Sequence, residues 1–385
     1  MKSFYTLLVS QWLANIGDVL YIVALIALLY QQTGSALMAA SFPIAVTAGM
    51  TLSGLFFARI LNHYSLGKTL VLSQLMKTIT LVLVLFTDSI LVLGLVMWIA
   101  FLDGFARPIQ ASFIPSLATN RQQANSLVQG SNQFIQLAMW PLGTMLVSLS
   151  SSAFALIVSL VLFSLSTVVT IYFYQSLTED IVDDGTEESI TLRDSLTYVR
   201  TSPFARRVTW FVTYESFVST LWISALLLVY LERHLQVDPG WWGTLNASFL
   251  ISMIAASAYL YRSRRAPSLP STAVLSIVAA LLFGVTEHLA FAILALVIQG
   301  AATQIRIIQT NTVIQEQIST TQLPYVYSVQ QTGYALAFSM GSLLFGLLAD
   351  RLPIDSVYLL GAFLTLPLIW IGRLTEQSIL TASSV

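Results

Sequence analysis

Apolar segments long enough to cross a membrane recur from residue 4 almost to the C-terminus of this 385-residue chain. About 20 consecutive apolar residues, folded as a helix, span the roughly 30 Å of hydrocarbon in a bilayer. Only 9% of the residues are charged, whereas soluble domains have about 25%. The pattern therefore predicts an all-α membrane protein without a large soluble domain.

The apolar windows between loop signals predict twelve transmembrane helices. Their approximate bounds are 5–30, 37–61, 69–87, 90–114, 124–149, 153–175, 206–231, 240–261, 269–286, 289–314, 324–349 and 355–374. A polar connection with the acidic run TEDIVDDGTEES divides them, and Thr191 and Asp194 have capping-box spacing ahead of a short interfacial helix. We predict an N-terminal six-helix bundle at 1–175, a cytoplasmic acidic linker at 176–203 and a C-terminal six-helix bundle at 204–385.

The distribution of basic residues predicts how the chain is oriented. With a cytoplasmic N-terminus, the outer side carries only Arg233 and Arg351. The inner side then carries Lys2, Arg59, Lys68, Arg121, Arg193, Arg200, Arg206, Arg207, Arg262, Arg264, Arg265 and Arg373. This positive-inside bias predicts that both termini and the linker lie in the cytoplasm.

The sequence contains no residue pattern for catalysis or metal binding. It has no cysteine, and its three histidines lie in separate loops without metal-ligand spacing. No nucleophile elbow or serine–histidine grouping is visible, and the net charge of −1 does not indicate a nucleic-acid partner. We therefore expect neither an enzyme nor a cofactor.

The two halves resemble each other at an offset of about 200 residues. Arg107 and Gln110 in ARPIQASFI correspond to Arg306 and Gln309 in QIRIIQTNTV. Similarly, ALIALLY of the first span corresponds to ALLLVY of the seventh. Two six-helix halves in parallel repeat are typical of transporters.

Six charged residues lie well inside predicted spans: Asp18, Lys77, Asp103, Arg107, Glu215 and Arg306. A charge at a helix centre costs about 2.5–3.5 kcal/mol to insert into a bilayer. These side chains must therefore be paired or face a wet cavity.

Spacing within the helices suggests partners for some of these charges. Asp103 and Arg107 stand at i and i+4, so we expect them to form an ion pair on one helix face. Asp18 lies near mid-membrane without a basic residue on its own helix, and such an acid can take up a proton. Lys77 could contact the polar region 15–18. A permanent salt-bridge role remains the alternative for Arg107 and Arg306.

Several motifs resemble those of the major facilitator superfamily, and more specifically its drug and macrolide efflux branch. They are NIGD at 15–18, TGSAL at 33–37 and IPSLATNRQQANSL at 114–127. The family's loop after the second helix resembles G-x-L-A-D-R-x-G-R-K, whereas this chain has ARILNHYSLGK, with Asn62 and His63 in place of Asp and Arg and with Lys68 retained. The fifth-helix antiporter signature, G-P-x-x-G-G, remains only as Pro141 and Gly143 within WPLG.

The resemblance implies a secondary transporter that works by alternating access, with the first, fourth, seventh and tenth helices lining its cavity. We expect proton coupling at Asp18, Glu215 and Asp103, and gate or structural roles for Asn62, His63, Lys68, Pro141, Gly143 and Pro108, the last loosening its helix. The expected cavity residues are Arg107, Arg306, Asn15, Gln11, Gln110, Gln133, Tyr214, Gln309 and Asn311.

The expected activity is proton-driven efflux of a small hydrophobic or amphipathic molecule across the cell membrane by a monomer. The proton gradient supplies the energy, and no cofactor, metal or nucleic acid takes part. Two alternatives remain open. One is an importer or lipid-like solute transporter of the same fold, and the other is a non-transporting membrane sensor or assembly partner.

Overall fold

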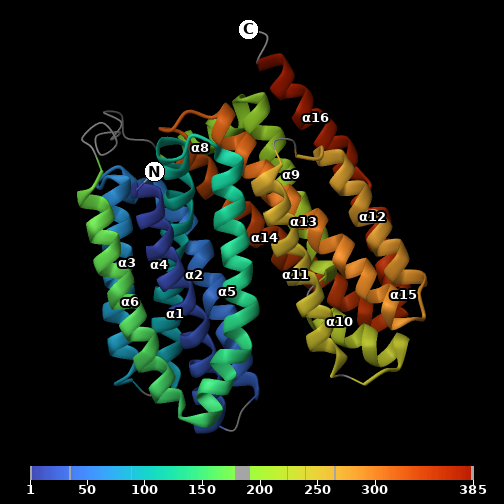
Figure 1. Cartoon of the computed structure of the whole chain (residues 1–385), viewed down its shortest axis with the longest axis horizontal. Helices are drawn as coiled ribbons and strands as arrows, with labels where there is room; N and C mark the ends of the chain where they lie inside the picture. Colours follow the sequence, from blue (N-terminus) through green and yellow to red (C-terminus); the bar gives the residue numbers. More distant parts are fainter. Residues whose placement is uncertain are drawn as a thin grey trace. The chain divides into compact units, whose positions relative to one another are not determined.

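The computed structural model describes residues 2–33, 36–87, 89–177, 191–222, 224–238, 240–263 and 266–382. The acidic run, residues 34–35 of TGSAL, and Arg264 and Arg265 lie outside the described residues. The described helices (Figure 1) are α1 (Lys2–Thr33), α2 (Ala36–Leu61), α3 (Leu66–Val84), α4 (Ser89–Leu117), α5 (Arg121–Leu149), α6 (Ser152–Gln175), α8 (Leu192–Thr201), α9 (Pro203–Ser219), η1 (Thr220–Trp222), α10 (Ser224–Tyr230), η2 (Leu231–Leu235), α11 (Trp241–Arg262), α12 (Leu269–Val285), α13 (Leu289–Gln317), α14 (Leu323–Arg351), α15 (Ile354–Thr365) and α16 (Pro367–Ala382).

These helices reproduce the twelve predicted spans. Among the described residues, nine segments are long and apolar enough to cross a membrane, and Ile354–Gln377 counts as one of them although it breaks at Leu366, between α15 and α16. A tenth, from Pro203 to Leu235, is bent by 41°. The shorter apolar α12 and the more polar α5 complete the set.

By its contacts, the chain forms two compact units. Unit 1 comprises Met1–Thr119, Ile135–Thr197 and Ser319–Thr332, and unit 2 comprises Asn120–Phe134, Tyr198–Ile318 and Gly333–Val385. The first half of α5 therefore belongs to unit 2, and the first third of α14 to unit 1. Neither helix is confined to one unit.

In unit 1, α1 packs along α6 and α2 along α4. Small hydroxyl side chains let α1 and α6 approach closely, as is common between helices in membranes. The Ser166 hydroxyl donates to the Ser10 carbonyl at 2.8 Å, and the Ser159 hydroxyl donates to the Gly17 carbonyl at 3.1 Å. Phe163 of α6 is fully buried beside these contacts.

In unit 2, α13 packs against α11 and α12, and α12 also packs against α15. The centre of its largest apolar cluster is aromatic: the Tyr230 and Phe283 rings stack at 3.9 Å, and Tyr358 packs edge-on and tilted against them. The Tyr230 hydroxyl donates to the Phe283 carbonyl at 2.7 Å. The buried Tyr230 hydroxyl therefore has a partner, as most buried polar groups do.

The predicted capping box and the short helix that follows it are confirmed. The Thr191 backbone N–H donates to Asp194 Oδ2 at 2.8 Å, and the Asp194 N–H donates to Thr191 Oγ1 at 3.2 Å. Hydrogen bonds from the Thr191 side chain and backbone hold the pKa of the Asp194 carboxyl below its ordinary value. The reciprocal bonds start α8 at Leu192.

Candidate functional site

Three charged side chains from three helices meet in the interior of unit 1. The Lys77 ammonium of α3 lies 2.6 Å from Asp18 Oδ1 of α1 and 2.7 Å from Asp103 Oδ1 of α4. It also lies 4.5 Å from the ring centroid of Phe163, a cation–π distance. We call Asp18, Lys77 and Asp103 the Lys77 cluster.

The Lys77 cluster is buried and carries an uneven charge. Lys77 is 2% exposed, and the Asp18 and Asp103 side chains are 22% and 20% exposed. Two carboxylates and one ammonium carry a formal charge of −1. Because buried charges are stable only when paired, the Lys77 ammonium allows both carboxylates to remain ionised in the interior of the helix bundle.

The predicted Asp103–Arg107 ion pair is wrong, because Asp103 pairs with Lys77 instead. Among the described residues Arg107 has no ion pair or hydrogen bond, and its side chain is exposed. The suggested contact of Lys77 with the region 15–18 is confirmed at Asp18. Spacing along one helix favoured the local partner, whereas the packing of α3 against α4 supplied a closer one.

A second charged centre lies in unit 2, where Arg306 of α13 reaches α9 and α12. Its guanidinium lies 3.4 Å from Glu215 Oε1 and donates to the Thr272 carbonyl at 3.0 Å and to the Ser276 hydroxyl at 2.8 Å. A further bond of 3.4 Å reaches Thr303 Oγ1 on its own helix. Arg306 is 3% exposed. We call this group the Arg306 centre.

The remaining predicted cavity residues differ in burial and in hydrogen bonding. Gln11 is buried on α1, and Gln110 and Gln133 are half-buried on α4 and α5. The Tyr214 hydroxyl donates to the Leu364 carbonyl at 2.7 Å, which ties α9 to α15. Asn15, one turn before Asp18, is half-buried, and so are Gln309 and Asn311 on α13. The Gln309 Oε1 atom is a buried acceptor without a hydrogen-bond partner among the described residues.

Pro108 does not interrupt α4, but it changes what the helix binds. Proline has no N–H to donate to the carbonyl four residues earlier. In the structure the Gly104 carbonyl accepts instead from Gln331 Nε2 of α14, at 3.3 Å. The same amide lies 3.4 Å from the Ser53 hydroxyl of α2. Our sequence reasoning missed Gln331, although the proline indicated an unpaired carbonyl at Gly104.

The first half of α5 makes similar amide contacts within unit 2. Asn125 Nδ2 donates to Gln315 Oε1 at 2.8 Å and to Thr312 Oγ1 at 3.1 Å. Gln122 Nε2 donates to the Leu260 and Ser263 carbonyls at the end of α11. Asn125 and Gln122 lie within IPSLATNRQQANSL, and our sequence reasoning gave neither residue a role.

The predicted gate residues lie at two places. Asn62 and His63 form the turn between α2 and α3, where His63 Nδ1 is 2.9 Å from the Arg59 carbonyl, and Lys68 is exposed at the start of α3. Pro141 and Gly143 lie within α5, and a Cβ added at Gly143 would be 3.3 Å from Leu20 of α1. No group of residues suited to holding a metal ion occurs in the described parts of the chain.

Comparison with known proteins gives the family. The model of the Major Facilitator Superfamily matches residues 7–268. The Bacillus subtilis (strain 168) protein named uncharacterized MFS-type transporter YfmI is 20% identical over 382 residues, which cover 95% of this chain and 94% of the relative. The MFS-type transporter YjbB of the same organism is 25% identical over 342 residues, covering 82% and 81%.

Two solved structures share the fold over nearly the whole chain. The human organic anion transporter MFSD10 (TETRAN) superimposes with a TM-score of 0.75 at 14% identity, covering 96% of this chain and 98% of that one. The E. coli fucose:proton symporter FucP superimposes with a TM-score of 0.76 at 12% identity, covering 97% and 98%. Since the family model spans more than half of the sequence, the chain belongs to the major facilitator superfamily of membrane transporters.

Proposed function

We propose that this protein exports a small hydrophobic or amphipathic molecule in exchange for protons. The observation that carries the proposal is the Lys77 cluster, in which one buried ammonium is shared by Asp18 and Asp103. Fold and family make the chain a secondary transporter rather than an enzyme. The coupling ion, the direction and the substrate class are the further steps that we propose.

Protonation of the Lys77 cluster would link charge to helix contacts. Addition of one proton to Asp18 or Asp103 brings the formal charge of the cluster from −1 to zero. The protonated acid is then a neutral carboxyl group, and its hydrogen bond from the Lys77 ammonium is weaker than the ion pair that it replaces. Since the three side chains come from α1, α3 and α4, the proton changes how firmly these helices are held together.

Glu215 is the second protonation site that we propose. Its cation, Arg306, has three further oxygen partners on α12 and α13 and stays bonded when Glu215 is neutralised. The Arg306 centre therefore changes less than the Lys77 cluster when a proton binds. We assign the larger part of the coupling to Asp18 and Asp103.

We propose an orientation from the positive-inside bias, with both termini in the cytoplasm and the protein in the cell membrane as a monomer. Residues 1–175 and 204–385 would be the two bundles that alternate access, joined by the linker 176–203. The described pockets favour an apolar or amphipathic substrate, because no charged side chain lines them. The remnant of the antiporter signature, Pro141 and Gly143, favours export.

The test is proton-coupled transport in inverted membrane vesicles that carry wild-type protein or Asp18→Asn. In wild-type vesicles energised to an acidic interior, a transported compound should release protons and be taken up against its gradient. We expect Asp18→Asn to abolish both signals, and Asp103→Asn to act in the same way. Wild-type uptake and proton release in Asp18→Asn would reject the coupling role of Asp18.

Asp350→Asn is the matched control, since Asp350 is an exposed acid at the end of α14 and has no ion pair within the described chain. It should retain full activity. Quantifying the variants by immunoblot separates lost coupling from lost insertion. A panel of neutral, cationic and anionic compounds, assayed with and without an uncoupler, identifies what is moved and whether protons drive it.

A further inference from the structure

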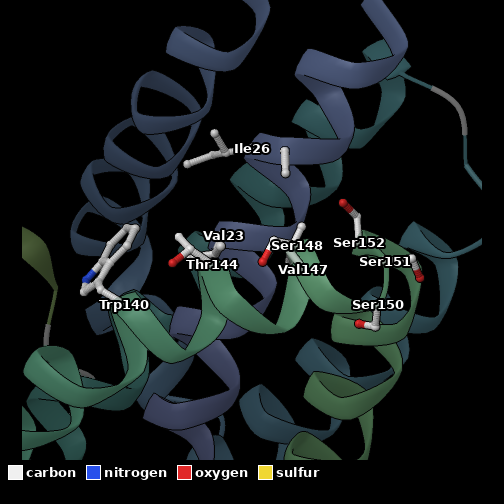
Figure 2. Close-up of a pocket in the computed structure, with 10 residues that line it drawn as sticks. Val23, Ile26, Trp140, Thr144, Val147, Ser148, Ser150, Ser151 and Ser152 are labelled. Atoms are coloured by element: carbon white, nitrogen blue, oxygen red, sulfur yellow. The ribbon is translucent and has the colours of Figure 1, made fainter.

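A pocket of about 790 Å³ lies on unit 1 between α1, α5 and the start of α6 (Figure 2). Its volume is within the range of about 300–1,000 Å³ that small-molecule sites occupy. It contains no residue of the Lys77 cluster. The lining residues are Val23, Ile26, Ala27, Trp140, Thr144, Val147, Ser148, Ser150, Ser151 and Ser152.

Trp140 forms an aromatic wall of this pocket. Its side chain is 44% exposed although it lies in the apolar interior of α5, and Figure 2 shows the indole at one end of the lining set. The close approach of α5 to α1 at Gly143 leaves Trp140 and Thr144 on the face that looks onto Val23 and Ile26. An exposed indole of this kind offers a flat surface for ring stacking.

Ser152 supplies to the pocket a buried polar group that lacks a partner. Its hydroxyl is buried, with the residue 4% exposed, and has no hydrogen bond among the described residues. The neighbouring hydroxyls already have hydrogen-bond partners. Thr144 donates to the Pro141 carbonyl, Ser148 donates to the Met145 carbonyl, and Ser151 caps α6 by accepting from the Phe154 N–H. A buried hydroxyl without a partner is costly, so a ligand that bonds it gains binding energy.

The charge of the lining limits the ligand further. No acidic or basic side chain is among the ten lining residues, and an ion placed there would lose its hydration without gaining a counter-ion. A second pocket, of about 420 Å³ on α1, α5 and α6, is lined only by aliphatic and methionine side chains. It offers no polar group to orient a ligand.

We infer that the 790 Å³ pocket binds an uncharged aromatic molecule with one hydrogen-bonding end. The ring stacks on Trp140, and the polar end bonds the Ser152 hydroxyl. This rests on the proposed export of hydrophobic or amphipathic compounds and narrows their class. The inference also assigns a binding role to Trp140, which directly precedes Pro141 of the incomplete antiporter signature in α5.

The experiment measures binding to the full-length protein in lipid nanodiscs by equilibrium dialysis, without an ion gradient. The probe is 2-(2-naphthyl)ethanol, and its charged match is 2-(2-naphthyl)ethylammonium, which keeps the ring and changes the polar end. We expect saturable binding of the alcohol and at least about tenfold weaker binding of the ammonium. Protein-free nanodiscs measure partition into lipid.

Variants then test the two contacts. Trp140→Ala should weaken binding of the alcohol about three- to tenfold, with Trp140→Phe restoring most of it, because the aromatic pair is lost and then regained. Ser152→Ala should weaken binding about two- to tenfold through the lost hydrogen bond. Trp98→Ala is the matched control, since Trp98 is 45% exposed on α4 and does not line the pocket.

Several outcomes overturn the inference: no saturable binding of the alcohol, equal affinity for the ammonium, or unchanged affinity in Trp140→Ala and Ser152→Ala. An equal loss in Trp98→Ala also overturns it. Thermal unfolding of each variant shows whether the fold is intact. Because binding is measured without a gradient, loss of proton-driven export with the expected binding pattern would reject the coupling alone, whereas export without that pattern would reject the pocket alone.

Discussion

Helices α4 and α13 occupy equivalent places in the two halves, yet their arginines have opposite surroundings. Arg107 is exposed and has no ion pair in the described part of the chain, whereas Arg306 is 3% exposed and bonded on three sides. The cause lies on the neighbouring helices. Ser276 and Ala302 stand 199 residues after Lys77 and Asp103, just as Arg306 stands 199 after Arg107.

In unit 1 the buried cation is therefore Lys77 of α3, and in unit 2 it is Arg306 of α13. Where the third helix of the half supplies a lysine, the arginine of the next helix has no acid to bind. Where it supplies Ser276, the arginine turns inward and binds that hydroxyl together with Glu215. Repeated sequence thus does not imply repeated electrostatics, and one substitution on a neighbouring helix can move the buried charge.

The largest effect on this comparison should come from removing each buried cation. We expect Lys77→Met to lower the free energy of unfolding by about 3–5 kcal/mol, because two buried carboxylates lose their counter-ion. The loss in Arg306→Met should lie toward the lower end of the same range of about 3–5 kcal/mol, since only one carboxylate, Glu215, then lacks a counter-ion. Denaturant titration in detergent micelles measures both.

The triple variant Lys77→Met with Asp18→Asn and Asp103→Asn is the control, because it removes the charges along with the cation. It should recover much of the stability lost in Lys77→Met alone. Two results would contradict this explanation: equal losses of stability in Lys77→Met and Arg306→Met, or no recovery in the triple variant. Either would mean that the number of carboxylates paired with the cation does not set the loss.

A smaller effect should come from the proline that α4 has and α13 lacks. Gln331→Ala should cost about 1–3 kcal/mol, since the Gly104 carbonyl then has no donor. In a Pro108→Ala background the new N–H at position 108 can bond that carbonyl within the helix, so the same substitution should cost less. A double-mutant cycle measures the coupling.

Thr332→Ala serves as the control for this cycle, because the Thr332 hydroxyl bonds the Ser328 carbonyl of its own helix. It should show no coupling to position 108. If Gln331→Ala costs the same with and without Pro108, the glutamine acts through contacts other than the carbonyl that proline leaves unpaired.

The smallest effect on stability should come from the exposed arginine. We expect Arg107→Gln to change the free energy of unfolding by no more than about 0.5 kcal/mol, as for surface substitutions. Arg306→Gln should cost several times as much, since it removes a buried guanidinium that has four polar partners. Transport of the same variants shows whether Arg107 has a role in the cavity; a loss of stability in Arg107→Gln equal to that in Arg306→Gln would contradict the burial difference.

Much of the fold could be predicted from the sequence. The twelve apolar windows agree with the described helices, because apolar length and helix-ending residues are local properties. The capping box at Thr191 and Asp194 was also predictable, since both groups lie within one turn. The partners of the charges were harder: Asp103 has Arg107 on its own helix, and only the packing of α3 beside α4 brings Lys77 closer.

By itself the sequence determined that this chain spans a membrane many times, that its halves repeat, and that six charges must be paired or hydrated, because hydrocarbon excludes unpaired charges and polar backbone wherever they occur. The tertiary structure decided which charges meet, which arginine is buried, where Gln331 bonds and that Ser152 and Trp140 line one pocket. These outcomes depend on the rotation and closeness of helices distant in sequence, and small residues such as Gly143 and Ser166 lie where two of these helices approach each other.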